Sequence, residues 1–303
     1  MNAAPVLLGY AAVVGVAAPR LVIRGAWRHR VPALGAAVWF ALLASFTLAT
    51  VLAASQLAAP TGHLHAGLLG LLHACGLGAG TPAVPDPTTA GGPALAMPLS
   101  VVTAVVGAFL FHLARAGLAR ARHRDRLDKV GVRSDRLRAT VLAHGTPAAY
   151  CLPGLRSRIV VSDAAVRLLT EEQLDAVLAH ERAHVVGRHH LVVAAAEAFA
   201  TVFPWLPLAR RTREETAVLL EMIADDRTLR SHSHEALATA MYAMAAGRTP
   251  KGAFGAGGAT ALLRIRRILG PRRATHPALR GSVAAVALAV PLLPLLVACP
   301  PGV

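Results

Sequence analysis

The sequence predicts a mainly α-helical, integral-membrane protein in which about four transmembrane helices accompany one α+β domain with a small antiparallel sheet. Hydrophobic residues make up 55% of the 303 positions, and the mean hydropathy is +0.52. These residues are concentrated in runs that approach the roughly 20 apolar positions that a membrane-spanning helix needs. A chain of this length could hold two ordinary domains, but the runs leave room for one modest soluble domain.

Four apolar runs are predicted to cross the membrane. They cover residues 5–23, 31–59, 94–118 and about 283–298. Arg20 interrupts the first run, but it lies near the end, where a long side chain can reach the membrane surface. A cleaved signal peptide would carry its basic residues before the apolar run, whereas here they follow it. We therefore divide the chain into a membrane region at 1–119, a soluble domain at 120–280 and a C-terminal span within 281–303.

The distribution of basic residues predicts which side of the membrane each segment faces. Cytoplasmic loops are enriched in Lys and Arg. Arginines gather at the end of the first run and again at 120–138, whereas the segment 60–92 contains a single charged residue, Asp86. We therefore expect the 120–280 domain in the cytoplasm and the 60–92 segment outside. The chain is predicted to be a multi-pass protein of the cell membrane, with the lipid bilayer as a partner.

The net charge of +15 raises the question of nucleic-acid binding. That function needs a basic helix or a platform of basic and aromatic residues, and aromatic residues are only 4% of the chain. We therefore expect no direct contact with nucleic acid. The three cysteines, Cys75, Cys151 and Cys299, form no CxxC pair, so they indicate neither a disulfide framework nor a cysteine zinc site.

A metal-binding signature lies within the soluble domain, in the sequence His-Glu-Arg-Ala-His at 180–184. His180 and His184 project from one face of a helix and can bind one Zn²⁺ ion. Glu181 falls beside them and is placed to act as general base on a water molecule at the metal. The helix has a predicted start, with Thr170 as N-cap and Gln173 completing a capping box.

A third protein ligand is expected, because a catalytic zinc ion usually has three protein ligands and one water. Glu221 and Asp225 are four residues apart in an apolar helical stretch, where acidic groups need a partner. We predict Glu221 as the third metal ligand and Asp225 as the acceptor for a histidine N–H. A solvated acidic face is the alternative. Glu214 and Glu215 are assigned instead to the first turn of a helix that begins after Thr212.

The apolar segment 191–208 constrains the topology. If it crossed the membrane once, Glu221 would lie on the opposite side from His180, and the two could not share a metal. The segment must therefore be buried, interfacial or a hairpin that returns. We favour a helix at the membrane surface that ends in an interfacial or re-entrant turn.

Several motifs resemble those of the membrane-embedded peptidases of the β-lactam sensor-transducer (BlaR/MecR) family. They are the His-rich stretch 180–190, the Phe-Pro-Trp-Leu-Pro turn at 203–207 and the Glu-x-x-x-Asp helix at 221–225. The motifs are also similar to those of HtpX-type and CAAX-protease-type gluzincins. The resemblance covers about 95–230 and implies a zinc metalloendopeptidase. The sequence departs from the sensor family at 188–190, Arg-His-His, where members often carry an aspartate.

The segment before the metal helix resembles the strand-turn-strand that precedes the zinc helix in both groups. By this resemblance, the backbone of Ala149, Tyr150, Cys151 and Leu152 is an expected substrate-binding strand, which would hold a peptide in extended form. A small sheet that makes no contact with substrate is the alternative.

The resemblance implies two kinds of protein or peptide substrate. One is a cytoplasmic transcriptional repressor, cleaved in regulatory proteolysis. The other is a set of damaged membrane proteins, cleaved in quality control of HtpX type. A non-catalytic membrane receptor or scaffold is a third alternative, but Glu181 argues against it, because a purely structural zinc has no use for a base.

Overall fold

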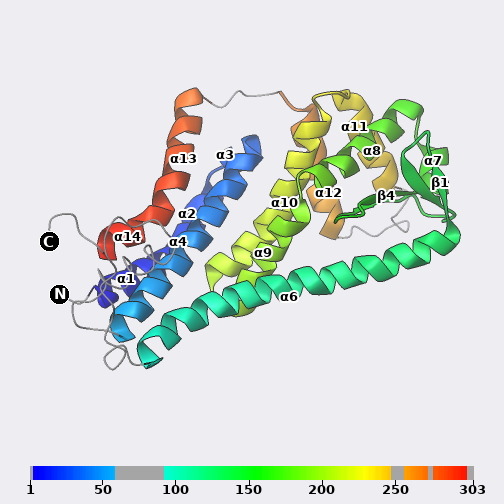
Figure 1. The fold of residues 1–303 in the computed structure, drawn as a ribbon. Coiled ribbons are helices and arrows are strands. Elements are labelled where there is room, and N and C mark those ends of the chain that lie inside the picture. Colours follow the sequence, from blue (N-terminus) through cyan, green and yellow to red (C-terminus); the bar gives the residue numbers. More distant parts are fainter. Residues whose placement is uncertain (1–2, 59–91, 247–255, 272–275, 299–303) are drawn as a thin grey trace, which may run out of the picture.

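The computed structural model describes residues 3–58, 92–246, 256–271 and 276–298, and it is mostly helical (Figure 1). The long helices lie alongside one another, and a small sheet follows the end of the longest helix. The predicted mainly α-helical class is therefore confirmed. Nearly all of the predicted external segment 60–92 lies outside the described residues.

The sheet separates two groups of helices along the chain. Before it come α1 (Ala4–Ala12), the π-helical turn η1 (Val13–Ala17), α2 (Ala18–Arg24), α3 (Trp27–Arg30), α4 (Pro32–Ala58) and α6 (Gly92–Val130). The strands are β1 (Gly131–Ser134), β2 (Ala139–Leu142), β3 (Ala149–Leu152) and β4 (Arg158–Ser162). After it come α7 (Asp163–Leu168), α8 (Glu171–Val186), α9 (His189–Val202), α10 (Pro207–Thr228), α11 (His234–Ala246), α12 (Ala256–Leu269), α13 (Pro277–Ala289), the 3-10 turn η2 (Val290–Leu292) and α14 (Leu293–Ala298).

Within the described residues, four helical stretches are long and apolar enough to cross a membrane. They are Ala4–Arg24, Pro32–Leu57, Ala96–Val130 and Pro277–Ala298. Each overlaps one of the predicted runs, but two have different ends. Helix α6 continues past residue 118 to Val130, because the basic segment there is rich in Ala and Arg, which favour helix. The last stretch already begins at Pro277, since proline suits the first helical turn.

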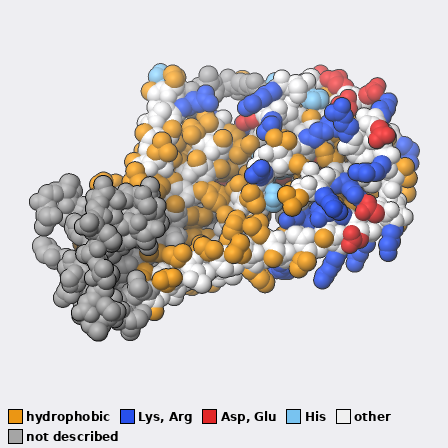
Figure 2. Space-filling model, viewed as in Figure 1, with side chains coloured by type: hydrophobic (Ala, Val, Ile, Leu, Met, Phe, Trp, Pro, Cys, Tyr) orange, Lys and Arg blue, Asp and Glu red, His pale blue; other side chains and the backbone are white. Residues whose placement is uncertain are grey.

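Hydrophobic and basic side chains occupy different parts of the surface. Figure 2 shows hydrophobic side chains over the helices at one end and along α6, and Lys and Arg side chains around the other end. On α6 the large exposed apolar side chains before residue 118 include Leu99, Val106, Leu110 and Phe111. This distribution is typical of a helix that is apolar where it crosses a bilayer and basic beyond it.

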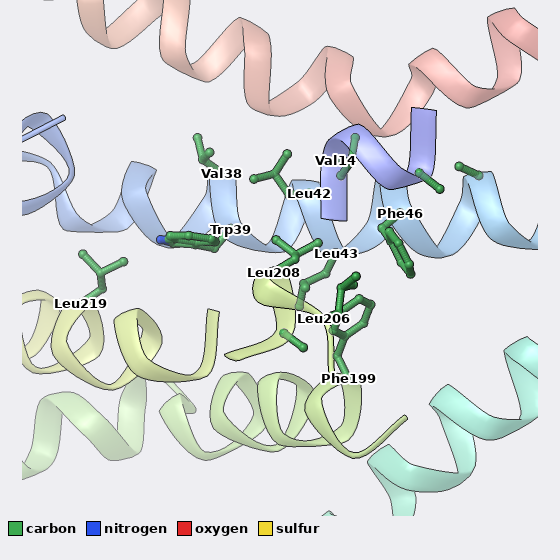
Figure 3. Close-up of a cluster of buried hydrophobic side chains, with 13 residues drawn as sticks. Val14, Val38, Trp39, Leu42, Leu43, Phe46, Phe199, Leu206, Leu208 and Leu219 are labelled. Atoms are coloured by element: carbon green, nitrogen blue, oxygen red, sulfur yellow. The ribbon is translucent and has the colours of Figure 1, made fainter. Parts of the chain in front are cut away.

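Helix α4 contributes to a buried hydrophobic cluster that joins the candidate spans to α9 and α10. Figure 3 shows Trp39 and Phe46 of α4 facing this pair of helices. The side chains opposite them include Phe199, Leu206 and Leu208. The rings of Phe46 and Phe199 meet edge to face with centroids 5.7 Å apart, a favoured aromatic geometry. Apolar packing therefore fixes α9 and α10 against α4.

The apolar segment 191–208 belongs to a helical hairpin. Helix α9 ends at Val202 with Phe203 as its C-cap, and Pro207 lies in the first turn of α10, so the chain reverses between them. Leu206 is buried in this turn, whereas Trp205 is 74% exposed. The segment therefore does not run on as one continuous helix, and its predicted place at the membrane surface stays a prediction. The reversal brings the second half of α10 beside α8.

The start of α10 differs from the prediction. The sequence places it after Thr212, but the helix begins at Pro207, and Thr212 is fully buried within it. Proline has a fixed φ that suits a helix N-terminus, and burial of Leu208 holds the first turn in place. Glu214 and Glu215 therefore lie in the helix interior.

The four strands form a mixed sheet in the order β1-β2-β4-β3. β1 pairs with β2, and β3 with β4, in antiparallel fashion, whereas β2 and β4 are parallel. The prediction of an antiparallel sheet is therefore wrong for the central pair. The reason is that β3 forms an edge, and the chain turns back from it to place β4 beside β2. Leu174 and Leu178 of α8 pack on one face of the sheet, and Leu127 of α6 packs on the other.

A polar contact joins the connection between α2 and α4 to α10. Arg28 donates from Nη1 to the carbonyls of Ile23 (2.5 Å) and Gly25 (2.8 Å). Its Nε donates to Glu215 Oε2 at 2.7 Å. Burial alone would raise the pKa of Glu215, but its contacts with His29 and Arg28 outweigh burial and lower the pKa. The contact therefore favours the ionised carboxylate.

Replacing Leu206 by alanine should destabilise the protein by about 2–5 kcal/mol, because the deletion leaves a cavity in a packed cluster. Trp205→Ala is the matched control, since the indole is 74% exposed and its loss should cost much less. Thermal unfolding in detergent, followed by circular dichroism, measures both. Equal destabilisation by the two changes would contradict the packing of this turn against α4.

Glu215→Gln should remove a pH-dependent part of the stability. Because folding lowers the pKa of Glu215, the carboxylate stabilises the folded protein above its unfolded pKa, and this contribution is lost as pH falls through the folded pKa. The wild type should be more stable than the variant at neutral pH and should approach it below about pH 4. Unfolding by denaturant at a series of pH values measures the difference, and a pH-independent difference would refute the ionic contact.

Candidate metal centre

Helix α8 presents the two histidines and the glutamate between them. It begins with the predicted capping box, in which the Gln173 N–H donates to Thr170 Oγ1 and the Thr170 N–H donates to Gln173 Oε1. His180 and His184 lie on one face because they are four residues apart. Their Nε2 atoms are 3.1 Å from each other, so the two rings converge on one point.

Glu221 of α10 completes a cluster of three donor groups. Its Oε2 lies 3.4 Å from His180 Nε2, and its Oε1 lies 3.4 Å from His184 Nε2. One donor atom from each of the three residues lies within 4.8 Å of the other two. The structure thus brings together the three residues predicted as ligands.

The donor set suits a zinc ion in both chemistry and spacing. Two imidazole nitrogens and one carboxylate oxygen are a common ligand set of catalytic zinc. Zinc–nitrogen bonds of roughly 2.0–2.1 Å separate two ligand nitrogens of a tetrahedral site by about 3.3 Å. The observed separation of 3.1 Å between the two Nε2 atoms is close to this value.

Asp225 lies behind the cluster and is fully buried. Its Oδ1 is 3.1 Å from His180 Nδ1, which is the place predicted for an acceptor that orients a ligand histidine. Arg264 of α12 holds the same carboxylate through Nε to Oδ2 at 2.8 Å and Nη2 to Oδ1 at 2.6 Å. The Arg264 Nη1 also donates to Glu221 Oε2 at 2.6 Å. One guanidinium group therefore joins two acidic side chains of the centre.

The role of Arg264 could not be predicted from the sequence. It follows Glu221 by 43 residues, in a stretch with several arginines that is typical of a basic surface. The available signal is the amphipathic pattern of α12, in which Ile265 and Ile268 alternate with arginines. That pattern predicts a packed helix, but it does not indicate which arginine enters the metal centre.

The charged groups of the centre shift one another's pKa values. Burial alone would lower the pKa of His180, but contacts with Asp225 and Glu221 raise it to about 9. Burial lowers the pKa of His184 to about 4, and the charge of the neighbouring His180 acts in the same direction. Burial alone would raise the pKa of Glu221, but His180 and Arg264 lower it to about 2. At neutral pH the metal-free centre therefore holds an anionic Glu221 and a neutral His184, and His180 would have to lose a proton to serve as a ligand.

Glu181 lies beside the donors and next to strand β3. Burial raises its pKa above the ordinary carboxyl value, and the charge of His180 opposes this shift. A raised pKa brings a carboxylate closer to the range that suits a general base at neutral pH. Cys151 of β3 is the neighbour of Glu181. Burial raises the pKa of this thiol to about 12, and the charge of Glu181 acts in the same direction. The thiol therefore stays protonated.

The predicted substrate strand is β3, which forms one edge of the sheet and packs alongside α8. Ala149 and Cys151 contact the buried cluster that includes α8. Tyr150 and Leu152 belong to the opposite face, against α6, where the Tyr150 hydroxyl is 2.7 Å from His123 Nε2. The structure therefore brings the backbone of this strand and Cys151 toward the centre, and it turns two of the four predicted side chains away.

His189 stands in the region where the sequence lacks the aspartate of the sensor family. Arg188 has φ +49° and turns the chain sharply after α8. The His189 ring then packs on Gly187, where an added Cβ would lie 2.5 Å from His189 Nε2. His189 Nδ1 is 2.8 Å from His184 Nδ1. It therefore contacts the His184 ring from behind, in the position that Asp225 has relative to the other histidine.

Arg264→Ala should destabilise the metal-free protein by about 3–5 kcal/mol, because the buried Asp225 carboxylate loses its arginine partner. The double variant Arg264→Ala/Asp225→Ala should cost less than the sum of the single changes. Arg266→Ala, an exposed position on the same helix, is the control. Unfolding by denaturant without metal measures all four variants, and additive effects would show that the two side chains do not interact.

Comparison with known proteins identifies the family of the segment that holds the three candidate ligands. Residues 115–250 match the family described as Peptidase family M48. No curated protein and no solved structure shows a significant match to the chain. The matched segment includes Glu221 and Asp225 but ends before Arg264. The match is to the family as a whole, so the resemblance to sensor-transducer or HtpX-type members stays a prediction. Peptidases of this family are zinc metalloproteases, and residues 115–250 constitute a peptidase M48 family domain.

Proposed function

We propose that the protein is a zinc-dependent endopeptidase of the cell membrane that hydrolyses peptide bonds at a site facing the cytoplasm. The observation that carries this proposal is the convergence of His180, His184 and Glu221 within 4.8 Å, beside the partly buried Glu181. A structural zinc site is closed by four protein ligands, whereas three protein ligands leave a position for a water molecule. The M48 family domain supports the same class of activity.

The side chains around the centre have separate tasks in this reaction. A bound zinc ion supplies Lewis acidity toward a water molecule and the peptide carbonyl. Glu181 takes a proton from the attacking water and delivers it to the leaving amine. Asp225 and His189 keep the two ligand imidazoles oriented. Strand β3, at the edge of the sheet among the described residues, offers backbone groups to an extended peptide beside Glu181.

The distribution of charge supports the cytoplasmic orientation. Helix α6 leads from a candidate span directly into β1, and its last part is rich in arginine. Basic clusters next to a span favour the cytoplasmic side. The return of the α9–α10 hairpin to α8 supports a common side of the membrane for the ligands of both helices.

We further propose that the substrate is a regulatory protein, such as a cytoplasmic transcriptional repressor. The resemblance to the sensor-transducer peptidases supports this choice. A soluble repressor would approach the β3 edge from the cytoplasm and would need no route through the bilayer.

Protein purified in detergent is expected to contain one zinc ion per chain and to cleave an unfolded reporter such as casein. Glu181→Gln should retain zinc but lose at least about 10²-fold in cleavage rate, because a general base contributes roughly 10²–10⁴-fold. Glu221→Ala should lose most of both. Asp175→Asn, an exposed change on the same helix α8, is the matched control and should keep both. Mass spectrometry of metals and release of labelled peptides provide the two readouts.

Different results would reject different parts of the proposal. A wild type without zinc would refute the ligand assignment. Zinc binding with equal cleavage by wild type and Glu181→Gln would favour the receptor or scaffold. Comparison of new protein N-termini in cells that express the wild type or Glu181→Gln tests the substrate. Fragments of many membrane proteins, and of no DNA-binding regulator, would favour quality control instead.

A further inference from the structure

Helix α12 is fastened to two distant parts of the chain by one side chain, Arg267. Its Nη2 donates to Asp226 Oδ2 on α10 at 2.7 Å, and its Nε donates to the His29 carbonyl at 2.6 Å. His29 lies in α3, within the connection between the first two candidate spans, 238 residues away along the chain. Arg267 therefore bridges that connection and the helix that carries Glu221.

The same helix delivers Arg264 to the metal centre. Arg264 and Arg267 are three residues apart, so they lie on one side of α12. Ile265 and Ile268 pack instead against a buried cluster formed by α8 and α11. Apolar packing is not directional, so the polar contacts of the arginine side determine the position of α12 along α10.

We propose that Arg267 is a positioning residue of the metal centre, through which the connection Trp27–Arg30 controls how Arg264 meets Asp225. The proposal rests on the metal site of the proposed function. While Arg267 makes both contacts, α12 holds Arg264 in register with the Asp225 carboxylate, whose Oδ1 lies 3.1 Å from His180 Nδ1. Loss of this anchor allows α12 to shift, the carboxylate to rotate and the His180 ring to lose its orientation.

The region around α3, from Arg28 to Gly35, also contacts α10 directly. Arg28 binds Glu215 at 2.7 Å. Gly35 of α4 lies so close to α10 that an added Cβ would meet Leu219 Cδ2 at 3.3 Å. This region therefore contacts both α10 and α12, the two helices whose side chains meet at Asp225. A displacement of the first two candidate spans would change the relation between these helices and so the geometry of the ligands.

Arg267 differs from an ordinary surface arginine in burial and in partners. Its side chain is 20% exposed, and one of its two bonds goes to a backbone carbonyl of a remote segment. The neighbouring Arg266 is exposed, and no hydrogen bond or ion pair joins its side chain to the described residues. Arg266 therefore provides a control with the same charge on the same helix.

The test is the zinc affinity of the purified full-length protein, measured by competition with a chelator of known affinity. Arg267→Gln should weaken zinc binding by about 10-fold, the lower end of the range for residues that support metal ligands from outside. Arg267→Lys should fall between this variant and the wild type, because an ammonium group replaces one contact. Arg266→Gln should bind zinc like the wild type. Thermal unfolding without metal is followed in parallel.

Asp226→Asn keeps the proposal testable if Arg267→Gln does not fold, because it weakens one contact of Arg267 and leaves α12 unchanged. It should also weaken zinc binding, by less than Arg267→Gln.

Weaker zinc binding in the Arg267 and Asp226 variants, with Arg266→Gln unchanged, supports the proposal. Unchanged affinity would overturn it and leave Arg267 as a support of the fold alone. Tighter binding would also overturn it, because it would mean that Arg264 competes with zinc for Glu221. A wild type that binds no zinc would remove the metal site of the proposed function, and this proposal with it. If the wild type binds zinc and the variants bind it with the same affinity, this proposal alone is rejected.

Discussion

The candidate metal centre depends on the reversal of the chain between α9 and α10. The two histidines come from α8, and Glu221 comes from α10, so the third donor reaches them because the turn at 203–206 sends the chain back. Apolar packing holds this turn, since Leu206 and Phe199 are buried against α4. The two halves of helix α10 consequently lie in different environments. Its first half packs on the candidate spans, and its second half carries polar groups of the centre.

Much of the centre could be predicted from the sequence because it depends on the period of the α-helix. His180 and His184 are one helical turn apart, and so are Glu221 and Asp225, which places each pair on one side of its helix. The capping box at Thr170 is equally local. The candidate spans follow from run length and hydropathy, which need no knowledge of tertiary contacts.

The features that could not be predicted all depend on contacts between distant segments. The pairing of β2 with β4 is decided by where β3 places itself in the sheet. The start of α10 is decided by burial of its first turn against α4, which outweighs the capping signal at Thr212. Arg264 and His189 reach the centre because of how α12 and the α8–α9 corner pack. Short sequence patterns do not indicate such packing.

The unbroken helix α6 also sets a distance. Its 39 residues form a rod of about 58 Å at 1.5 Å per residue, while the hydrocarbon core of a bilayer is about 30 Å thick. If α6 crosses a bilayer, at most about 28 Å of it lies outside the hydrocarbon core, and this length limits how far the sheet can stand from the lipid. For the peptidase proposed above, a bond in a membrane-anchored polypeptide would then reach the β3 edge only across that distance. A soluble polypeptide would meet no such limit, so the length of α6 would bear on which polypeptides the proposed site can reach.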